Sequence, residues 1–174
     1  MLVGTRLRIV PLEKRHLEPL RLHRNHIETF SYLTSALPVT EKSQLFWYKT
    51  VTTDPTKMYF AIENKSGKFI GFVRLDEWDR VNRSIRAGID IVADERRHGL
   101  ATECYGVLLK YLFRQLGVHR VWLLVAQFNH AAVRLYEKIG FIPEGCYRDA
   151  LFRNGEFHDY MIMSLLETEY GKKK

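Results

Sequence analysis

The heptapeptide ERRHGLA (95–101) stands between an apolar run, IDIVAD (89–94), and a long amphipathic segment, TECYGVLLKYLFRQLG (102–117). The apolar run predicts a strand. The amphipathic segment predicts a helix, because its apolar residues recur three or four positions apart. The first turn of a helix offers unpaired N–H groups and the positive end of the helix dipole. The heptapeptide therefore predicts an anion-binding turn that suits a pyrophosphate, with a solvated basic turn as the simpler alternative.

Periodicity and turn residues outline the remaining elements on either side of this junction. Strands are predicted at residues 6–12, 58–63, 68–79, 85–93, 118–126, 145–152 and 157–167. Helices are predicted at 13–26, at 41–51 after Thr40 as N-cap, at 99–116 before Gly117 as C-cap, and between the caps Asn129 and Gly140. Mostly antiparallel strands with helices inserted late predict one mixed α/β (α+β) domain around a central sheet of about six to seven strands.

Composition limits the class of protein. The chain has 174 residues and a net charge of +7, and its basic residues form no stripe with interleaved aromatics, so a nucleic-acid module is not favoured. It has no apolar run long enough to span a membrane and no signal-peptide pattern at its start, so we expect a cytoplasmic protein. Its two cysteines, Cys104 and Cys146, are expected to be small buried hydrophobes.

Two motifs carry a family resemblance. RRHGLA (96–101) fits the GNAT N-acetyltransferase pattern of arginine or glutamine, two variable residues, glycine, a variable residue, and glycine or alanine. About 28 residues further on, NHAAVRLYEKIGF (129–141) resembles the second half of that family's core. The matching positions are Arg96, Gly99, Ala101, Asn129, Ala132, Tyr136, Gly140 and Phe141. The chain thus resembles the GNAT superfamily, in the subgroup of ribosomal-protein N-terminal, polyamine and amino-sugar acetyltransferases.

The resemblance extends over nearly the whole chain and implies a domain plan. It implies a single acetyltransferase domain at 1–174, with an acceptor-side part at about 1–57, an acetyl-CoA-binding core at about 58–141 and a C-terminal hairpin at about 142–168. It also implies that strand 89–92 splays away from strand 121–126. The family's often dimeric members suggest a homodimer.

The resemblance further implies how acetyl-CoA is held. The pyrophosphate is expected on backbone N–H groups from Arg97 through His98, Gly99 and Leu100 to Ala101, with Arg96 and Arg97 attracting the anion. The pantetheine arm is expected along Ile91, Val92 and Ala93, with Asn129 donating a hydrogen bond from the side. A backbone N–H near Val92 is expected to polarise the thioester carbonyl.

Acetyl transfer to an amine needs a neutral amine and a proton for the leaving thiolate. By resemblance Tyr136 is the proton donor, although it also lies on an apolar helix face where a core aromatic would sit. The strand glutamate that serves many relatives as base is replaced by Arg86. The open candidates for the base are Asp90, Asp76, Glu77, His26 and a chain of waters. The sequence has no CxxC or HExxH motif, so it predicts no metal site.

The acceptor is left open between a small-molecule primary amine, such as a polyamine or amino sugar, and a protein N-terminus. Carboxylates that would suit a cationic amine are Asp76, Glu77, Asp79 and Asp159. Aromatic residues that would line a pocket, or form the core, are Phe30, Tyr32, Phe46, Trp47 and Trp78. A non-catalytic acyl-CoA-binding module on the same scaffold is the alternative function, because a fold does not fix an activity.

Overall fold

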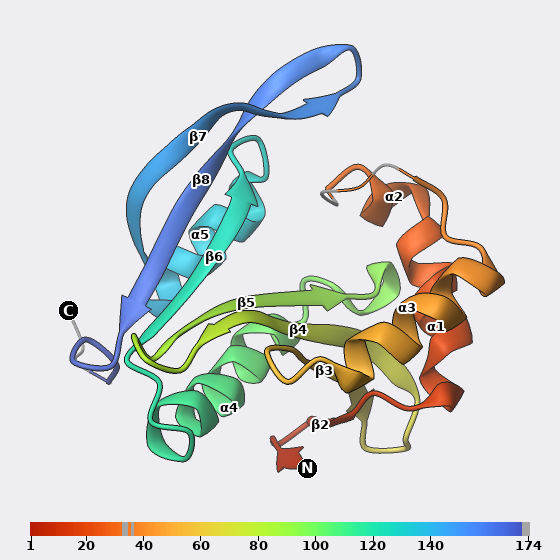
Figure 1. Cartoon of the computed structure of the whole chain (residues 1–174), viewed down its shortest axis with the longest axis horizontal. Coiled ribbons are helices and arrows are strands. Elements are labelled where there is room, and N and C mark those ends of the chain that lie inside the picture. Colours follow the sequence, from red (N-terminus) through yellow and green to blue (C-terminus); the bar gives the residue numbers. More distant parts are fainter. Residues whose placement is uncertain (33–34, 36, 172–174) are drawn as a thin grey trace.

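The computed structural model describes residues 1–32, 35 and 37–171, and one twisted sheet runs through it (Figure 1). Its strands, in spatial order, are β1 (Leu2–Val3), β2 (Leu7–Pro11), β3 (Met58–Asn64), β4 (Phe69–Asp79), β5 (Ser84–Ile91), β6 (Arg120–Ala126), β8 (Glu156–Leu166) and β7 (Ile142–Arg153). The α-helices are α1 (Leu17–Asn25), α2 (Ile27–Phe30), α3 (Glu41–Thr53), α4 (Leu100–Arg114) and α5 (His130–Ile139). The mixed, mostly antiparallel α/β fold is confirmed, with one strand more than the sequence predicts, because β1 has only two residues.

Helices cover both faces of the sheet. One apolar cluster joins α4 and α5 to the face that carries Val73, Ile85 and Val121. A second cluster joins α1 and α3 to the face that carries Phe72. Because neighbouring strand residues point to opposite faces, Val73 and Phe72 assign the two clusters to opposite sides of β4. In the described part of the chain no helix is long and apolar enough to cross a membrane.

The sheet opens between β5 and β6. These strands are parallel and pair only where Ser84–Arg86 face Arg120–Trp122. Beyond that point β6 turns away toward the β7–β8 hairpin, which projects from the rest of the molecule (Figure 1). The predicted splay is therefore present, and it leaves the last residues of β5 without a partner strand on one side.

Most predicted helix boundaries hold, with local corrections. Thr40 caps α3 through a capping box, and Asn129 and Gly140 cap α5 as predicted. The single helix predicted at 13–26 is instead a 3-10 turn at Lys14–His16 followed by α1. The C-cap of α4 is Gln115 rather than Gly117, because Gly117 takes its positive φ of 63° two residues later. The prediction for Cys146 is wrong: it is exposed on the edge strand, whereas Cys104 is fully buried.

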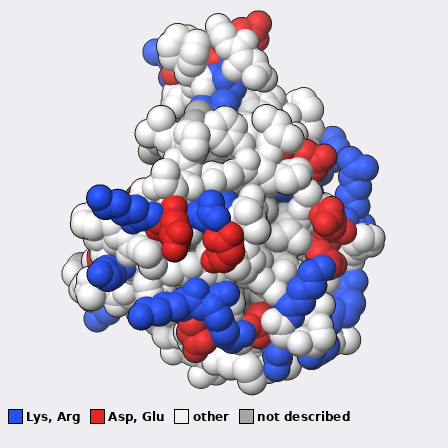
Figure 2. Space-filling model, turned by 90° about the vertical axis from the view of Figure 1, so that its right-hand side faces the viewer, with Lys and Arg blue, Asp and Glu red and all other residues white. Residues whose placement is uncertain are grey.

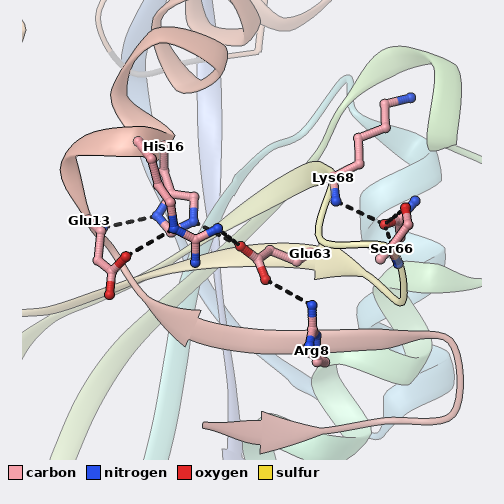
Figure 3. Close-up of polar contacts among 8 residues, drawn as sticks. Arg8, Glu13, His16, Glu63, Ser66 and Lys68 are labelled. Atoms are coloured by element: carbon pink, nitrogen blue, oxygen red, sulfur yellow. Dashed lines mark hydrogen bonds and ion pairs between the residues drawn. The ribbon is translucent and has the colours of Figure 1, made fainter.

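A buried carboxylate, Glu63, ties the N-terminal segment to the sheet (Figure 3). Its Oε1 accepts hydrogen bonds from Arg15 at 2.5 Å and from His16 at 3.0 Å, and its Oε2 lies 3.4 Å from Arg8. Burial alone would raise the pKa of Glu63, but the bonds from His16 and Arg15 outweigh it and leave that pKa lowered. The Glu63 cluster, meaning Glu63 with Arg8, Arg15 and His16, thus joins β2, the 3-10 turn and β3.

Candidate functional site

The predicted anion-binding turn has the geometry of a cradle. Arg97 and Gly99 both take left-handed backbone conformations, with φ of 65° and 76°, and α4 begins directly afterwards at Leu100. The first bond of the helix runs from the Glu103 N–H to the Gly99 carbonyl at 3.1 Å. The N–H groups of residues 97–102 therefore precede the helical ladder and remain available to an anion.

The side chain of Arg96, the first residue of the motif, is hydrogen-bonded to other parts of the protein. Its Nε donates to the Ile91 carbonyl at 2.9 Å, and its Nη2 donates to Thr29 Oγ1 at 2.9 Å. The side chain thus fastens the turn to the end of β5 and to α2. Arg97 and His98 are exposed, so their side chains can reach an anion in solution.

Arg6, which the sequence gives no reason to select, also supports this turn. It lies between β1 and β2 and donates through Nη1 to the His98 carbonyl at 2.7 Å. Its backbone N–H and Nε bind the two carboxylate oxygens of Glu103 at 2.7 and 2.8 Å. Burial would raise the pKa of Glu103, but these bonds from Arg6 outweigh it and lower that pKa. No local pattern links residues that are 97 positions apart in the chain.

The splayed end of β5 directs backbone groups toward the gap at Ile91, one of the predicted residues, and at Ile89, whereas the N–H of Val92 faces β4. The Val92 N–H donates to the Ile70 carbonyl of β4 at 3.0 Å, so it is not free to polarise a thioester. Because successive strand residues direct their N–H groups to opposite sides, the N–H groups of Ile89 and Ile91 face the gap left by β6. Ala93 begins a 3-10 turn, Ala93–Glu95, and its carbonyl accepts the Arg96 N–H.

The second motif forms α5 and its N-cap on the other side of the gap. Asn129 accepts the Ala132 N–H through Oδ1 at 3.2 Å, which leaves its Nδ2 as the group that can donate to a ligand. Tyr136 packs edge-on against Tyr105 and Phe141, with ring centroids 5.7 and 5.8 Å away. Burial raises the pKa of Tyr136 to about 12, and the negative charge of Asp90 adds to the shift. Tyr136 is therefore both a packed aromatic and a protonated phenol.

Asp90 lies on the face of the sheet that α1 covers. It stands opposite Phe72 of β4 and two residues from Gly88, which stands opposite Arg74. Strand alternation directs the side chains of Asp90, Arg74 and Arg86 to this same face. Asp90 also acts electrostatically on His23 of α1 and on Tyr136 of α5. The charge of Asp90 therefore acts on groups of both α1 and α5.

The other candidate bases have partners elsewhere. Asp76 is buried and accepts two hydrogen bonds of 2.7 and 3.0 Å from Arg86. Arg86 occupies the β5 position where many relatives have a glutamate, and its carboxylate partner Asp76 lies on the neighbouring strand β4. Glu77 lies 2.8 Å from the same arginine. His26 is exposed and caps α2 by accepting the Glu28 N–H.

The remaining acceptor-side candidates are distributed more widely. Asp79 binds Asn82 in the β4–β5 turn, and Asp159 accepts the Asp149 N–H in the hairpin. Asp159 also lines a cavity of about 440 Å³ at the end of β6. Trp47 packs against Tyr59 and Phe72, and Tyr32 contacts Phe128 across the opening, whereas Phe46 is 73% exposed. Phe30 and Trp78 are partly buried, and Trp78 lies under Arg80.

Comparison with known proteins agrees with this geometry. Residues 6–142 match the family model described as the acetyltransferase (GNAT) domain. The chain belongs to the GNAT acetyltransferase family. The spermidine N(1)-acetyltransferase of Vibrio cholerae is 33% identical over 117 residues, which is 67% of this chain and 68% of that protein. A putative ribosomal N-acetyltransferase of Bacillus subtilis is 34% identical over 108 residues, which is 62% of this chain and 59% of that protein.

The fold similarity covers more of the chain than the sequence similarity. The crystal structure of the Vibrio cholerae spermidine N-acetyltransferase in complex with CoA and spermine has a TM-score of 0.90. It is 28% identical and covers 96% of this chain and 99% of its own. The GNAT chain described here is an N-acetyltransferase with acetyl-CoA as its acyl donor. The unpaired N–H run at residues 97–102 and the splay beside Ile89 and Ile91 fit that co-substrate.

Proposed function

We propose that this GNAT enzyme acetylates the primary amine of a small molecule by direct transfer, with Asp90 as the base and Tyr136 as the proton donor. The observation that carries the proposal is the position of Asp90. It lies on the face of the sheet that α1 covers, and its negative charge contributes to the raised pKa of Tyr136 on α5. Acetyl-CoA supplies the acetyl group as a thioester.

The chain's own groups would hold the co-substrate along the turn and the gap. The N–H groups of residues 97–102, with Arg97 and His98 beside them, would bind the pyrophosphate. Backbone groups of Ile89 and Ile91 and the Nδ2 of Asn129 would bind the pantetheine arm. Arg96 and Arg6 would act by positioning, because their side chains donate hydrogen bonds to the Ile91 and His98 carbonyls and so hold the turn in place.

Asp90 would accept a proton from the incoming ammonium and so free its lone pair. Among the candidate carboxylates, Asp76 and Glu77 are held by Arg86, whereas no hydrogen bond to the Asp90 carboxylate is found among the described residues. Tyr136 would give its proton to the departing sulfur. Its raised pKa of about 12 keeps it protonated across the physiological range.

Two assays test the proposal. Binding of CoA should raise the melting temperature, because a ligand that binds only the folded state stabilises it. Thiol release from acetyl-CoA with an amine panel should then fall about 100-fold or more in Tyr136→Phe, while the CoA-induced shift is retained. Undiminished turnover in that variant would remove the donor role. A CoA shift with no turnover of any amine would favour a non-catalytic acyl-CoA-binding module.

We also propose a cytoplasmic homodimer. Cys146 is an exposed free thiol, which a reducing compartment would preserve. The edge strand β7 and its hairpin partner expose Tyr147, Phe152 and Phe157, at 50, 54 and 63%. An uncovered edge strand with apolar side chains is suited to pairing with a second copy. Sedimentation of the wild type and of Phe152→Lys should give a dimer and a monomer, respectively. The mechanism above requires neither nucleic acid nor a membrane.

A further inference from the structure

The charged side chains on the face of the sheet beneath α1 differ in how completely they are paired. Arg86 is bound by Asp76 and Glu77 and lies 5.6 Å from the ring centroid of Trp122. These three charged residues satisfy one another. The space around Asp90, further along β5, is different.

Three cationic or donor groups near Asp90 lack hydrogen-bond partners. In the described residues no partner is found for the buried Nε atoms of Arg24 and Arg74 or for the buried Nε2 of His23. Arg74 stretches across Gly88, because a Cβ added there would lie 3.2 Å from its Nη2. Its Nε also lies 3.4 Å from Asp76, a carboxylate already taken by Arg86. We call Arg24, Arg74, His23 and Asp90 the acceptor cluster.

Electrostatics link the members of the acceptor cluster. Burial lowers the pKa of Arg24, while the charges of Asp90 and Arg74 act on it in opposite directions. Burial likewise lowers the pKa of His23, which keeps the imidazole neutral at pH 7. The guanidinium groups of Arg24 and Arg74 thus share a partly buried space with Asp90, and Arg74 also lies 3.4 Å from Asp76. Buried donors without partners are costly, and a ligand that satisfies them would recover that cost.

A chain of hydrogen bonds from Arg96 through Thr29 sets the tautomer of His23. Arg96 donates to Thr29 Oγ1, which lies 3.3 Å from His23 Nδ1. Since Thr29 Oγ1 accepts a hydrogen bond from Arg96, its hydroxyl group can donate a hydrogen bond to Nδ1 of His23. The imidazole then carries its proton on Nε2 and presents it as a donor. His23 is only 6% exposed, so this donor is shielded from solvent and has no partner among the described residues.

We propose that the acceptor carries a carboxylate or phosphate in addition to its primary amine, and that Arg24 and Arg74 bind this anion while Asp90 faces the amine. The inference rests on the proposed function, because it names the substrate class of the same site. A polyamine would place further positive charge beside Arg74 and beside Arg24, for which no ion pair is found among the described residues. A zwitterionic amine matches both signs of the acceptor cluster.

Calorimetry on the CoA-loaded protein tests this with matched pairs of probes. The pairs are 2-aminoethyl phosphate with 2-aminoethanol, and 4-aminobutanoate with 1,4-diaminobutane, and spermidine is added as a polyamine. We expect the anionic member of at least one pair to bind at least about 10-fold more tightly, since a charge-assisted bond has that value. The preferred pair tells phosphate from carboxylate. Equal or tighter binding of the cationic probes would overturn the inference.

Variants show whether the arginines make the contact. Arg24→Gln and Arg74→Gln should each weaken binding of the preferred anionic amine about 10- to 100-fold and change the affinity for its neutral or cationic counterpart much less. Arg21→Gln is the matched control, since Arg21 lies on the same helix and pairs with Glu18. An equal loss for both members of a pair would assign the arginines a structural role and contradict the proposal. The CoA-induced melting shift verifies folding in every variant.

The two proposals fail in different ways. If the anionic amine binds but thiol release is absent, the proposed reaction is wrong and the anion site stands. If spermidine turns over faster than every anionic amine, the reaction stands and the anion site is wrong.

Discussion

Two charged clusters lie on the α1 face of the same sheet, and they differ in how their charges are matched. In the Glu63 cluster, one buried carboxylate receives bonds from Arg15 and His16, with Arg8 at 3.4 Å, and within the described residues only the Nε of Arg8 is an unpaired buried atom. In the acceptor cluster, Arg24 and His23 each have a buried nitrogen without a partner among the described residues, and the buried Nε of Arg74 has no hydrogen bond there and lies 3.4 Å from Asp76.

The difference separates stability from function. Buried polar groups are normally paired, so a cluster that closes on itself holds elements together. Orphaned donors beside an open strand gap indicate that a ligand completes the set. On the side of the molecule that α1 and α3 form, basic and acidic side chains are interspersed over the surface (Figure 2). Surface charge alone would therefore not distinguish the two clusters. Changes in each cluster should therefore be read by different measurements.

The largest effect is expected from Asp90→Asn. Without a base at this position, kcat/KM should fall about 100-fold or more, because positioned proton transfer contributes that much to a rate. The melting shift with CoA should persist, since the variant leaves residues 97–102 intact. Glu18→Gln, which alters an exposed carboxylate of α1, is the control and should retain full activity. Full activity in Asp90→Asn would place the base elsewhere and weaken the functional reading of the acceptor cluster.

How much of this was readable in the sequence depends on the range of each interaction. The strand-to-helix junction at 95–101, the caps of α5 and the chain order of every strand except β1 follow from local patterns and were predicted correctly. The partners of Arg6, Arg96 and Asp76 were not, because they come from residues distant in the chain or across the sheet.

Register explains the remaining differences. The side on which the Val92 N–H falls depends on the pairing of β5 with β4, which periodicity alone does not determine. The exposure of Cys146 follows from the hairpin standing at the edge of the sheet, which its alternation could not reveal. The roles of the site residues stay predictions until they are measured.

A backbone change should disturb the acceptor cluster without touching its side chains. A Cβ on Gly71 would lie 2.5 Å from the Asp90 carbonyl, so Gly71→Ala must push β4 and β5 apart at the base of the cluster. We expect a loss of about 2–3 kcal/mol in the free energy of unfolding together with lower activity. Gly106→Ala is the counterpart, because a Cβ there meets nothing within 4 Å and should stabilise α4 by roughly 0.5–1 kcal/mol. Equal effects in urea melts would refute the predicted contact.

The Glu63 cluster should respond in stability and not in catalysis. Glu63→Gln removes the carboxylate charge that Arg8, Arg15 and His16 surround and should cost about 2 kcal/mol at pH 7. The folded pKa of Glu63 is lowered from the ordinary 4.5, so its contribution is complete above that value and is lost as the pH falls through the folded pKa. The stability of the wild type and of the variant should therefore converge in acid, while kcat/KM at pH 7 stays within about twofold. A parallel pH dependence would show that the carboxylate is not specially stabilised.

The smallest effect gives the most direct contrast, because the same substitution should have opposite signs in the two clusters. Arg24→Met keeps a long side chain and removes a partly buried charge that lacks a bond at Nε, so it should leave stability unchanged or raise it by up to about 1 kcal/mol. Arg15→Met removes a bond of 2.5 Å to Glu63 and should lower stability. Guanidinium-chloride midpoints measure both. A clear loss of stability in Arg24→Met would mean that the acceptor cluster is paired within the protein itself, and the contrast between structural and functional charge would no longer hold.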